Sequence, residues 1–334
     1  MMRRVIACCL VLGVLALAGS AVAQTTTLPP FPVNRVRPSP EKDLIKTARM
    51  TTTSYNFLKL ATNARSAGMG DAYTAVGNDL SAVFYNPAGI TQIEKWELVG
   101  GYTKWLVGSQ IGTFALGVKT NVATLALSFV NFMTEEFEET TSGNPGGTGR
   151  MVRGSDMALG LTIAKQVTDK LSVGGNIRWV QEDLDLVKYA NVDIDFGTLF
   201  YTGFKSTRIG MTLKNLGGDK DVVVQKARFP MTFNLSGAME VYGNLGDPVS
   251  VTVAAEQVFY TDYANRYHIG MEAWVNNRLA LRAGYKTGYD SESWSVGGGL
   301  KQKLGGQTVK IDFSYHRAEA LNENPLRLAL GLAF

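Results

Sequence analysis

The sequence predicts an all-β fold, a transmembrane antiparallel β-barrel of about 14 strands with an N-terminal plug that contains a short helix. From Glu97 to the end of the chain the dominant hydrophobic period is two, which is typical of strands with two different faces. Most of these alternating segments have about 10 to 14 residues, enough for a tilted strand to cross a bilayer. After Gly19 no apolar run approaches the roughly 20 residues that a spanning helix needs.

The alternation is clearest in the last segment, where Leu326, Leu328 and Leu330 point one way while Arg327 and Ala329 point the other. A soluble β-sandwich or propeller also alternates, but fourteen long strands would then need covered edges, whereas closure into a barrel removes edges altogether. The predicted strands are residues 97–106, 109–119, 122–137, 155–167, 170–187, 191–202, 206–216, 231–243, 248–260, 265–276, 278–289, 293–305, 307–320 and 325–334.

The connections between these strands favour an outer-membrane barrel, in which short periplasmic turns alternate with longer external loops. When the connections are numbered along the chain, the longer ones at 138–154, 217–230 and 321–324 have odd numbers. The first connection, 107–108, also has an odd number but is short. The tight turns at even positions are 120–121, 168–169, 244–247, 276–277 and 305–306.

The first residues predict export. Arg3 and Arg4 precede an apolar run from Val5 to Gly19, and residues 20–23 end in the small-x-small pattern of a signal peptidase site. This run is too short for a transmembrane anchor. We therefore expect a signal peptide at 1–23 that is cleaved after Ala23, and a location in the cell outer membrane.

Composition divides the remaining chain into three parts. Residues 24–50 hold a threonine cluster and five prolines, which suits a flexible leader. Residues 51–96 are rich in small side chains and form the predicted plug, and residues 97–334 form the predicted barrel.

The sequence indicates no enzyme and no cofactor. Cleavage removes both cysteines, which leaves two histidines and excludes a Cys/His metal cluster or a Cys–His nucleophile. Ser314 and His316 share a strand face, but no Gly-x-Ser-x-Gly motif accompanies them. The acidic stretches 135–139 and 182–185 lack the spacing of a calcium loop, so we interpret them as solvated external charge. A formal net charge of +4 for the whole chain argues against nucleic acid as a partner.

The predicted plug carries a recognisable pattern, residues 58–76 (LKLATNARSAGMGDAYTAV) followed by 78–90 (NDLSAVFYNPAGI). This pattern resembles the opening of the PorV/PorQ family, which is similar to FadL-type outer-membrane barrels. Asp71 stands where many members of that family carry glycine.

Simple stereochemistry assigns structural roles within this pattern. Gly68 and Gly70 permit close backbone approach, Asp79 can cap a short helix from Leu80 to Tyr85, and Pro87 prevents that helix from continuing. A ring of fourteen strands needs such an internal element to close its lumen. The full set of expected structural residues is Gly68, Gly70, Asp79, Asn86, Pro87 and Gly89 in the plug and the terminal Phe334 for barrel assembly.

The resemblance implies a component of a type IX secretion system that carries or tethers secreted cargo. Its expected partners are outer-membrane lipid, secreted cargo proteins and secretion-system subunits. The alternative is a FadL-like transporter of long-chain fatty acids or other hydrophobic compounds, and a general diffusion porin is disfavoured because the plug should obstruct the lumen. The side chains expected to face that lumen are polar: Arg178, Arg282, Lys286, Lys310, Asp312 and Arg327.

We predict that the mature protein begins at Gln24 and fractionates with the outer membrane, because residues 3–23 form an export signal. N-terminal sequencing of membrane-extracted protein measures this. An intact Met1, or recovery in the soluble fraction without detergent, would contradict the prediction.

Overall fold

The computed structural model describes residues 53–222, 225–289, 292–318 and 323–334. The predicted signal peptide and leader lie outside these residues, as do the first two residues of the predicted plug.

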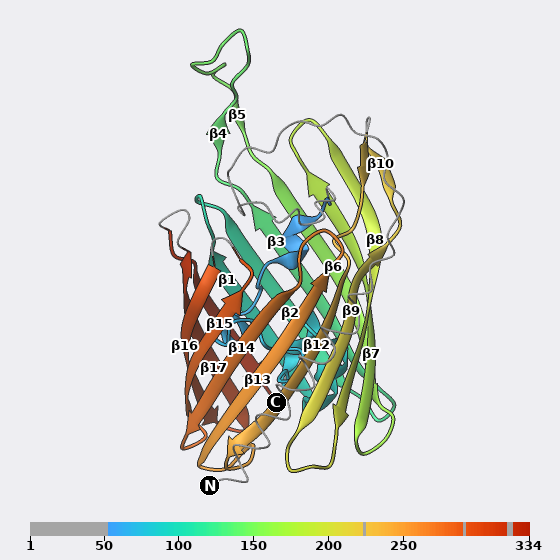
Figure 1. Ribbon diagram of the computed structural model, residues 1–334, viewed down its shortest axis with the longest axis vertical. Coiled ribbons are helices and arrows are strands. Elements are labelled where there is room, and N and C mark those ends of the chain that lie inside the picture. The colour runs from blue at the N-terminus through green and yellow to red at the C-terminus, as the bar shows by residue number, and fades with distance from the viewer. Residues whose placement is uncertain (1–52, 223–224, 290–291, 319–322) are drawn as a thin grey trace, which may run out of the picture.

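The wall is a closed antiparallel barrel, and its fourteen strands confirm the predicted fold class (Figure 1). Each wall strand pairs with the one before it, and β18 pairs with β1 to close the ring. The wall strands are β1 (Trp96–Lys104), β2 (Gln110–Lys119), β3 (Thr124–Met133), β6 (Ser155–Gln166), β7 (Leu171–Asp183), β8 (Lys188–Tyr201), β9 (Arg208–Gly217), β12 (Thr232–Tyr242), β13 (Val249–Tyr260), β14 (Arg266–Val275), β15 (Leu279–Thr287), β16 (Glu292–Leu304), β17 (Gln307–Ala318) and β18 (Leu326–Ala333).

The outer surface of the wall is apolar and the inner surface is polar. In β18, Leu328 is 54% exposed while its neighbours Arg327 and Ala329 are 1% and 3% exposed. Exposed leucine, isoleucine and phenylalanine side chains recur on alternate positions of β2, β3, β6, β8 and β15. A surface with so much exposed apolar area suits lipid rather than water.

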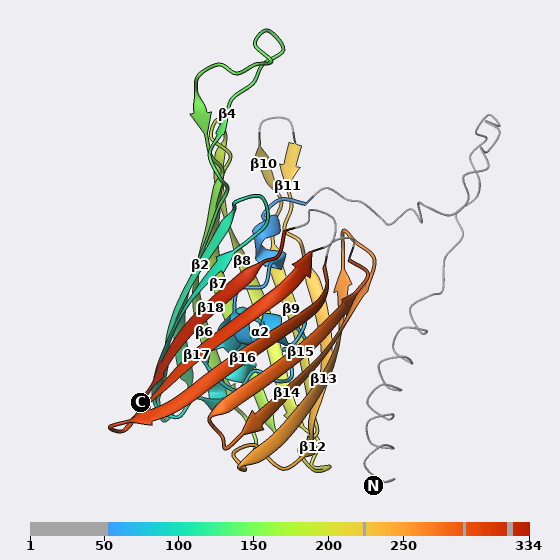
Figure 2. The same ribbon diagram turned by 90° about the vertical axis from the view of Figure 1, so that its left-hand side faces the viewer.

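The two ends of the barrel differ. At the short-turn end, two-residue turns are built from backbone conformations that favour asparagine and glycine, with positive φ at Asn276, Asn277, Gly305 and Gly306. At the long-loop end, two small hairpins extend beyond the wall (Figures 1 and 2). One joins β4 (Phe137–Glu138) to β5 (Met151–Val152), and the other joins β10 (Lys220–Val222) to β11 (Gln225–Ala227).

Two strand boundaries were wrong in the sequence analysis. The strand predicted over 122–137 ends at Met133, and the chain continues into the separate β4 hairpin. The strand predicted over 170–187 ends at Asp183. In both places acidic residues follow the strand, and charged side chains cannot continue a lipid-facing alternation.

The barrel closes at a seam that includes the end of the chain. Phe334 stacks on Trp96 with ring centroids 3.5 Å apart, and the Phe334 amide donates a hydrogen bond of 3.0 Å to the Trp96 carbonyl. The terminal aromatic residue therefore fastens the last strand to the first.

Residues 53–93 lie inside the barrel (Figure 2) and contain four short helical segments. The helix predicted from Leu80 to Tyr85 is a 3-10 helix that ends at Phe84. None of the helices in the described residues is long and apolar enough to cross a membrane. The segments are η1 (Asn56–Lys59), α2 (Ala64–Gly68), η2 (Leu80–Phe84) and η3 (Pro87–Gln92).

We predict that Leu328→Arg destabilises the barrel by about 2–4 kcal/mol, because it places a charge on the lipid-facing surface. Ala329→Ser is the matched control, since Ala329 faces the lumen. Urea titration of both variants in lipid vesicles measures the difference. Equal stability of the two variants would show that the assignment of Leu328 to the lipid side and of Ala329 to the lumen side is wrong.

Candidate functional site

The plug follows the lumen from the long-loop end to the short-turn end. At the long-loop end, the Thr53 hydroxyl donates to Asp262 (2.6 Å) and the Tyr55 amide donates to Glu182 (3.0 Å). Glu182 is thus part of the plug attachment, which corrects its interpretation as solvated charge. The plug ends beside the first residue of β1, Trp96, so it spans most of the lumen.

The short helix α2 packs closely against β15, β16 and β17. Asn63 caps it by accepting a hydrogen bond of 2.7 Å from the Arg65 amide. A Cβ at Gly68 would lie 3.2 Å from the Cα of Gly297, and one at Gly70 would lie 2.8 Å from the amide nitrogen of Tyr285. Larger side chains at either glycine would push the plug away from the wall.

Asp71 adopts a left-handed backbone conformation with φ of 57°. Glycine would adopt this conformation without the steric cost that a side chain brings. Burial raises the pKa of the Asp71 carboxyl, but the positive charges around it, first Lys286 and then Arg327, together hold that pKa well below its usual range. Lys286 also pairs with Glu292 at 2.7 Å, so one lysine of the wall joins the plug to β16.

The buried carboxylate of Glu272 joins the plug to the wall through two arginines. It accepts hydrogen bonds from Arg65 of the plug at 2.7 and 2.9 Å and from Arg282 of β15 at 2.7 Å. Arg65 also forms a salt bridge with Asp79, with 2.7 Å between Nη1 and Oδ2. Arg282 forms one with Asp312, with 2.6 Å between Nη1 and Oδ1. Burial raises the pKa of Asp79, yet the charges of Arg65 and Lys310, with hydrogen bonds from Arg65 and Tyr73, together lower it to about 2.

The remaining expected plug residues form the turns of η2 and η3. The Asp79 side chain accepts a hydrogen bond from the Ser81 amide at 3.0 Å, and the Asn86 side chain accepts one from Ala88 at 3.1 Å. Pro87 is the first residue of η3. A Cβ at Gly89 would lie 2.7 Å from the Cβ of Ala82, so these two turns leave no space for a side chain there.

A cavity of about 320 Å³, here called the mouth chamber, opens at the long-loop end. Four aromatic side chains line it: Trp105, Tyr260, Tyr263 and Tyr289. Arg266 also lines it, and its guanidinium carbon lies 3.8 Å from the ring centroid of Tyr289 and 5.0 Å from that of Tyr263. Such a volume suits a small organic molecule.

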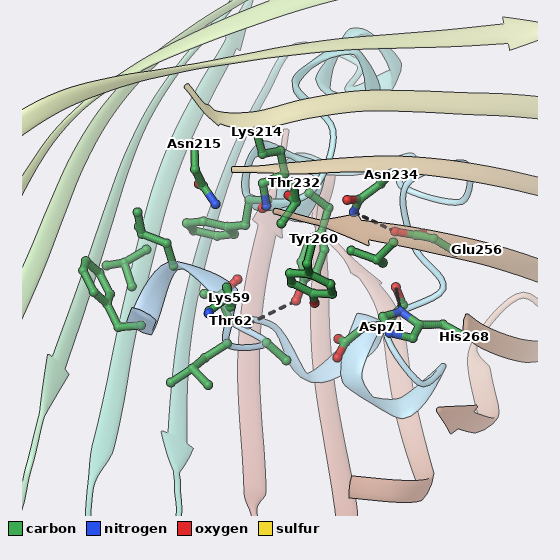
Figure 3. A pocket seen from close by; sticks show the side chains of 18 of the residues that line it. Lys59, Thr62, Asp71, Lys214, Asn215, Thr232, Asn234, Glu256, Tyr260 and His268 are labelled. Carbon is green, nitrogen blue, oxygen red and sulfur yellow. Dashed lines mark hydrogen bonds between the residues drawn. The ribbon is translucent and has the colours of Figure 1, made fainter. Parts of the chain in front are cut away.

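A second cavity of about 80 Å³, the inner chamber, shares Lys59, Leu60, Ala61, Tyr260 and Tyr289 with the mouth chamber. Figure 3 shows its polar side chains gathered from the plug and from several wall strands, with Asn234 hydrogen-bonded to Glu256. The two chambers therefore adjoin, and the lining of each combines aromatic and charged side chains.

Ser314 and His316 do not form a hydrogen-bonded pair. Ser314 and His316 share the lumen face, yet neither the Oγ nor either ring nitrogen has a hydrogen-bond partner among the described residues. Within the same residues, no three His, Cys, Asp or Glu side chains are grouped to hold a metal ion.

Sequence reasoning identified the turn residues of the plug but missed the side chains that attach it. Arg65 and Glu272 carry the attachment, and Glu256 accepts further hydrogen bonds from Tyr73 and Thr74 of the plug. A signal was present: Arg65 is the charged residue in a run of small ones, and Glu256 and Glu272 are acids on the inward positions of predicted strands.

Comparison with known proteins shows what the chain resembles. The model of an uncharacterised protein family (UPF0164) matches residues 36–184, which include the plug and the strands up to β7. No curated protein sequence matches the chain.

Solved structures share the fold at low sequence identity. The toluene transporter TbuX of Ralstonia pickettii has a TM-score of 0.57 at 14% identity, with 81% of this chain and 97% of that one covered. The toluene transporter TodX of Pseudomonas putida also has a TM-score of 0.57, at 13% identity, with 86% and 98% covered. A FadL homologue of Pseudomonas aeruginosa has a TM-score of 0.52 at 12% identity, with 86% and 99% covered. The chain therefore has a FadL-like barrel fold, and these neighbours are transporters rather than enzymes.

We predict that Glu272→Gln destabilises the plugged barrel by about 3–5 kcal/mol, because it leaves two buried guanidinium groups without their shared carboxylate. Glu139→Gln on the half-exposed β4–β5 hairpin is the control for the same chemical change. Chemical denaturation in vesicles, combined with limited proteolysis of the plug, measures the effect. Equal stability of the two variants would show that the plug is held by other contacts.

Proposed function

We propose that this chain is an outer-membrane barrel that admits small hydrophobic compounds from outside, as a FadL-like transporter. The observation that carries the proposal is the mouth chamber, a cavity at the long-loop end between the first plug residues and the wall, where four aromatic rings lie beside four charged side chains. In outer-membrane barrels the longer loops face outward, so this chamber would face the external medium.

The chemistry of the mouth chamber favours flat or elongated apolar molecules. Aromatic rings offer large apolar faces and bind other rings in stacked or edge-on arrangements. The Arg266 guanidinium already occupies one side of Tyr289, so the exposed face of Tyr263, which is 42% exposed, is a natural first contact. A general diffusion porin would need an open aqueous lumen instead of a plug held by buried ion pairs.

In this proposal the transported compound enters the mouth chamber and then leaves the barrel sideways through the wall, not along the barrel axis. The Arg65–Glu272–Arg282 network crosses the lumen there, and an apolar molecule would have to break buried ion pairs to continue straight down. The wall is irregular beside the inner chamber: the register of β8 and β9 shifts between Ile194 and Phe196, and Asn215 has φ of 59°. Asn215 and Lys214 line the inner chamber, so we place a sideways exit at this irregularity.

The second candidate function is handling of secreted cargo as a type IX secretion component. The pattern of residues 58–90 supports it by resemblance, and so does the β4–β5 hairpin, which extends far beyond the wall and exposes Phe137 and Met151. Neighbouring genes for secretion subunits, or for cargo with matching C-terminal domains, would favour this candidate over uptake.

We predict that intact cells producing the protein take up the fluorescent hydrophobic probe N-phenyl-1-naphthylamine faster than cells without it. The double variant Tyr263→Ala/Tyr289→Ala should slow this uptake by about threefold or more, because two aromatic contacts of the mouth chamber are lost. Fluorescence measured against time reports the rate.

The matched control is the double variant Tyr102→Ala/Tyr242→Ala, which removes two exposed tyrosines that do not line the chamber. It should leave the uptake rate unchanged. Uptake that does not depend on the protein, or an equal decrease in both double variants, would contradict the proposed function.

A further inference from the structure

The exposed charge at the short-turn end, the lower end in Figure 1, is mostly positive. Seven lysine and arginine side chains are exposed at or beside its turns, whereas the acids there are Glu94, Asp169 and Asp247. The seven residues, here called the rim cations, are Lys95, Lys119, Lys165, Lys170, Lys205, Arg278 and Lys303.

The same bias continues inside this end of the barrel. A cavity of about 270 Å³ opens there between the plug and the turn residues Gly246 and Asn277. Its charged lining consists of four cations and two acids, which are Arg65, Arg282, Lys301 and Lys310 with Asp79 and Asp312.

The rim cations lack the acidic partners that exposed cations have at the other end of the barrel. At the long-loop end, Arg150 forms a salt bridge with Asp185 at 2.6 Å. None of the rim cations takes part in a salt bridge within the part of the chain that the structure describes. The Lys119 Nζ donates to the Thr91 carbonyl at 3.0 Å, which is a neutral acceptor. The positive charge of the rim is therefore not compensated by these residues.

The rim cations surround the barrel. At least one of them lies at or beside the turns that join β2 to β3, β6 to β7, β8 to β9, β14 to β15 and β16 to β17. Lys95 adds a further charge directly before β1. A protein docked on one side of this end would contact only a sector of such a ring, whereas lipid surrounds a barrel on all sides.

Strongly exposed apolar side chains stand beside the rim cations. Each is more than half exposed and lies within three residues of a rim cation: Val122, Val167, Phe204 and Leu304. The Lys205 Nζ lies 5.7 Å from the ring centroid of Phe204. At a membrane surface such apolar side chains lie toward the hydrocarbon, while lysine side chains extend their ammonium groups to the polar layer. The combination indicates the level of lipid head groups.

We propose that the rim cations bind the phosphate groups of anionic phospholipids in the leaflet at the short-turn end. The lysine ammonium groups and the Arg278 guanidinium donate to phosphate oxygens, and a juxtamembrane cation stabilises such binding by simple attraction. The apolar neighbours contact the upper part of the acyl chains. This surface lies on the outside of the barrel, so the inference does not depend on the uptake proposal.

Quenching of tryptophan fluorescence by brominated lipids tests the inference. The full chain is reconstituted in phosphatidylcholine vesicles with Trp96 as its sole tryptophan, and a twin retains only Trp294; the others are replaced by phenylalanine. Trp96 is exposed at the short-turn end, and Trp294 is exposed near the long-loop end, where β16 begins. The two probes are dibrominated phosphatidylglycerol and dibrominated phosphatidylcholine, which differ in the charge of the head group.

We expect phosphatidylglycerol to bind beside Trp96 about threefold or more tightly than phosphatidylcholine, because several unpaired cations lie near that site. Beside Trp294 the two lipids should bind equally, since acids accompany the cations at that end. Salt at about 0.5 M should remove most of the preference beside Trp96, because exposed charges are screened.

Two double variants then locate the charge. Lys95→Gln/Lys119→Gln should lower the preference beside Trp96 by about twofold, because these rim cations are its neighbours: the Lys119 amide donates to the Lys95 carbonyl at 2.6 Å. Lys104→Gln/Lys188→Gln removes two exposed lysines of the long-loop end and should leave the preference unchanged.

Three results would overturn the inference: equal binding of the two lipids beside Trp96, the same preference beside Trp294, or an unchanged preference in Lys95→Gln/Lys119→Gln. Saturable binding of poly-glutamate by the same vesicles, without a lipid preference, would also overturn it and assign the rim cations to an acidic protein. None of these results bears on the uptake of N-phenyl-1-naphthylamine, which is measured separately.

Discussion

The width of the ring is the constraint on which the other features depend. Fourteen strands enclose more space than their own inward side chains can fill, so the chain must supply a further element. Residues 53–93 supply it, but a segment of such short helices cannot bury enough apolar surface to fold alone. The plug is therefore held by the wall, through the Glu272 carboxylate that accepts from Arg65 and Arg282 and through Glu256, which accepts from Tyr73 and Thr74.

This solution divides the lumen chemically. Ion pairs in the middle of the lumen create a polar layer with an aromatic cavity on one side and a cationic cavity on the other. Apolar compounds and charged compounds therefore meet different surfaces at the two ends of one barrel. The FadL-like neighbours share the fold at 12–14% identity, too little to transfer side-chain chemistry, so this division is a property of the present residues.

The sequence predicted the wall well and the interior poorly, for a physical reason. The two-residue period is a local pattern, and the alternation of Leu328 with Ala329 is visible without knowledge of any partner. Capping chemistry is also local, which is why Asp79 and Pro87 could be assigned to the start and the end of a short helix. The partners of Arg65 could not be predicted, because Glu272 is 207 residues away in the chain and only the closed ring brings them together. The mouth chamber has the same origin, since its aromatic residues come from three different loops and the end of one strand.

That separation of 207 residues also bears on how the molecule assembles. The plug precedes every wall strand in the chain, yet α2 packs on β15, β16, β17 and β18, which are the last four strands. Contacts between such distant segments form late and slowly, because a long loop must be ordered before they stabilise anything. The η2 and η3 segments, in contrast, pack on strands from β1 to β8, which come directly after the plug in the chain. Seating of α2 is therefore coupled to the addition of the last strands, whereas the rest of the plug meets its wall partners earlier in the sequence.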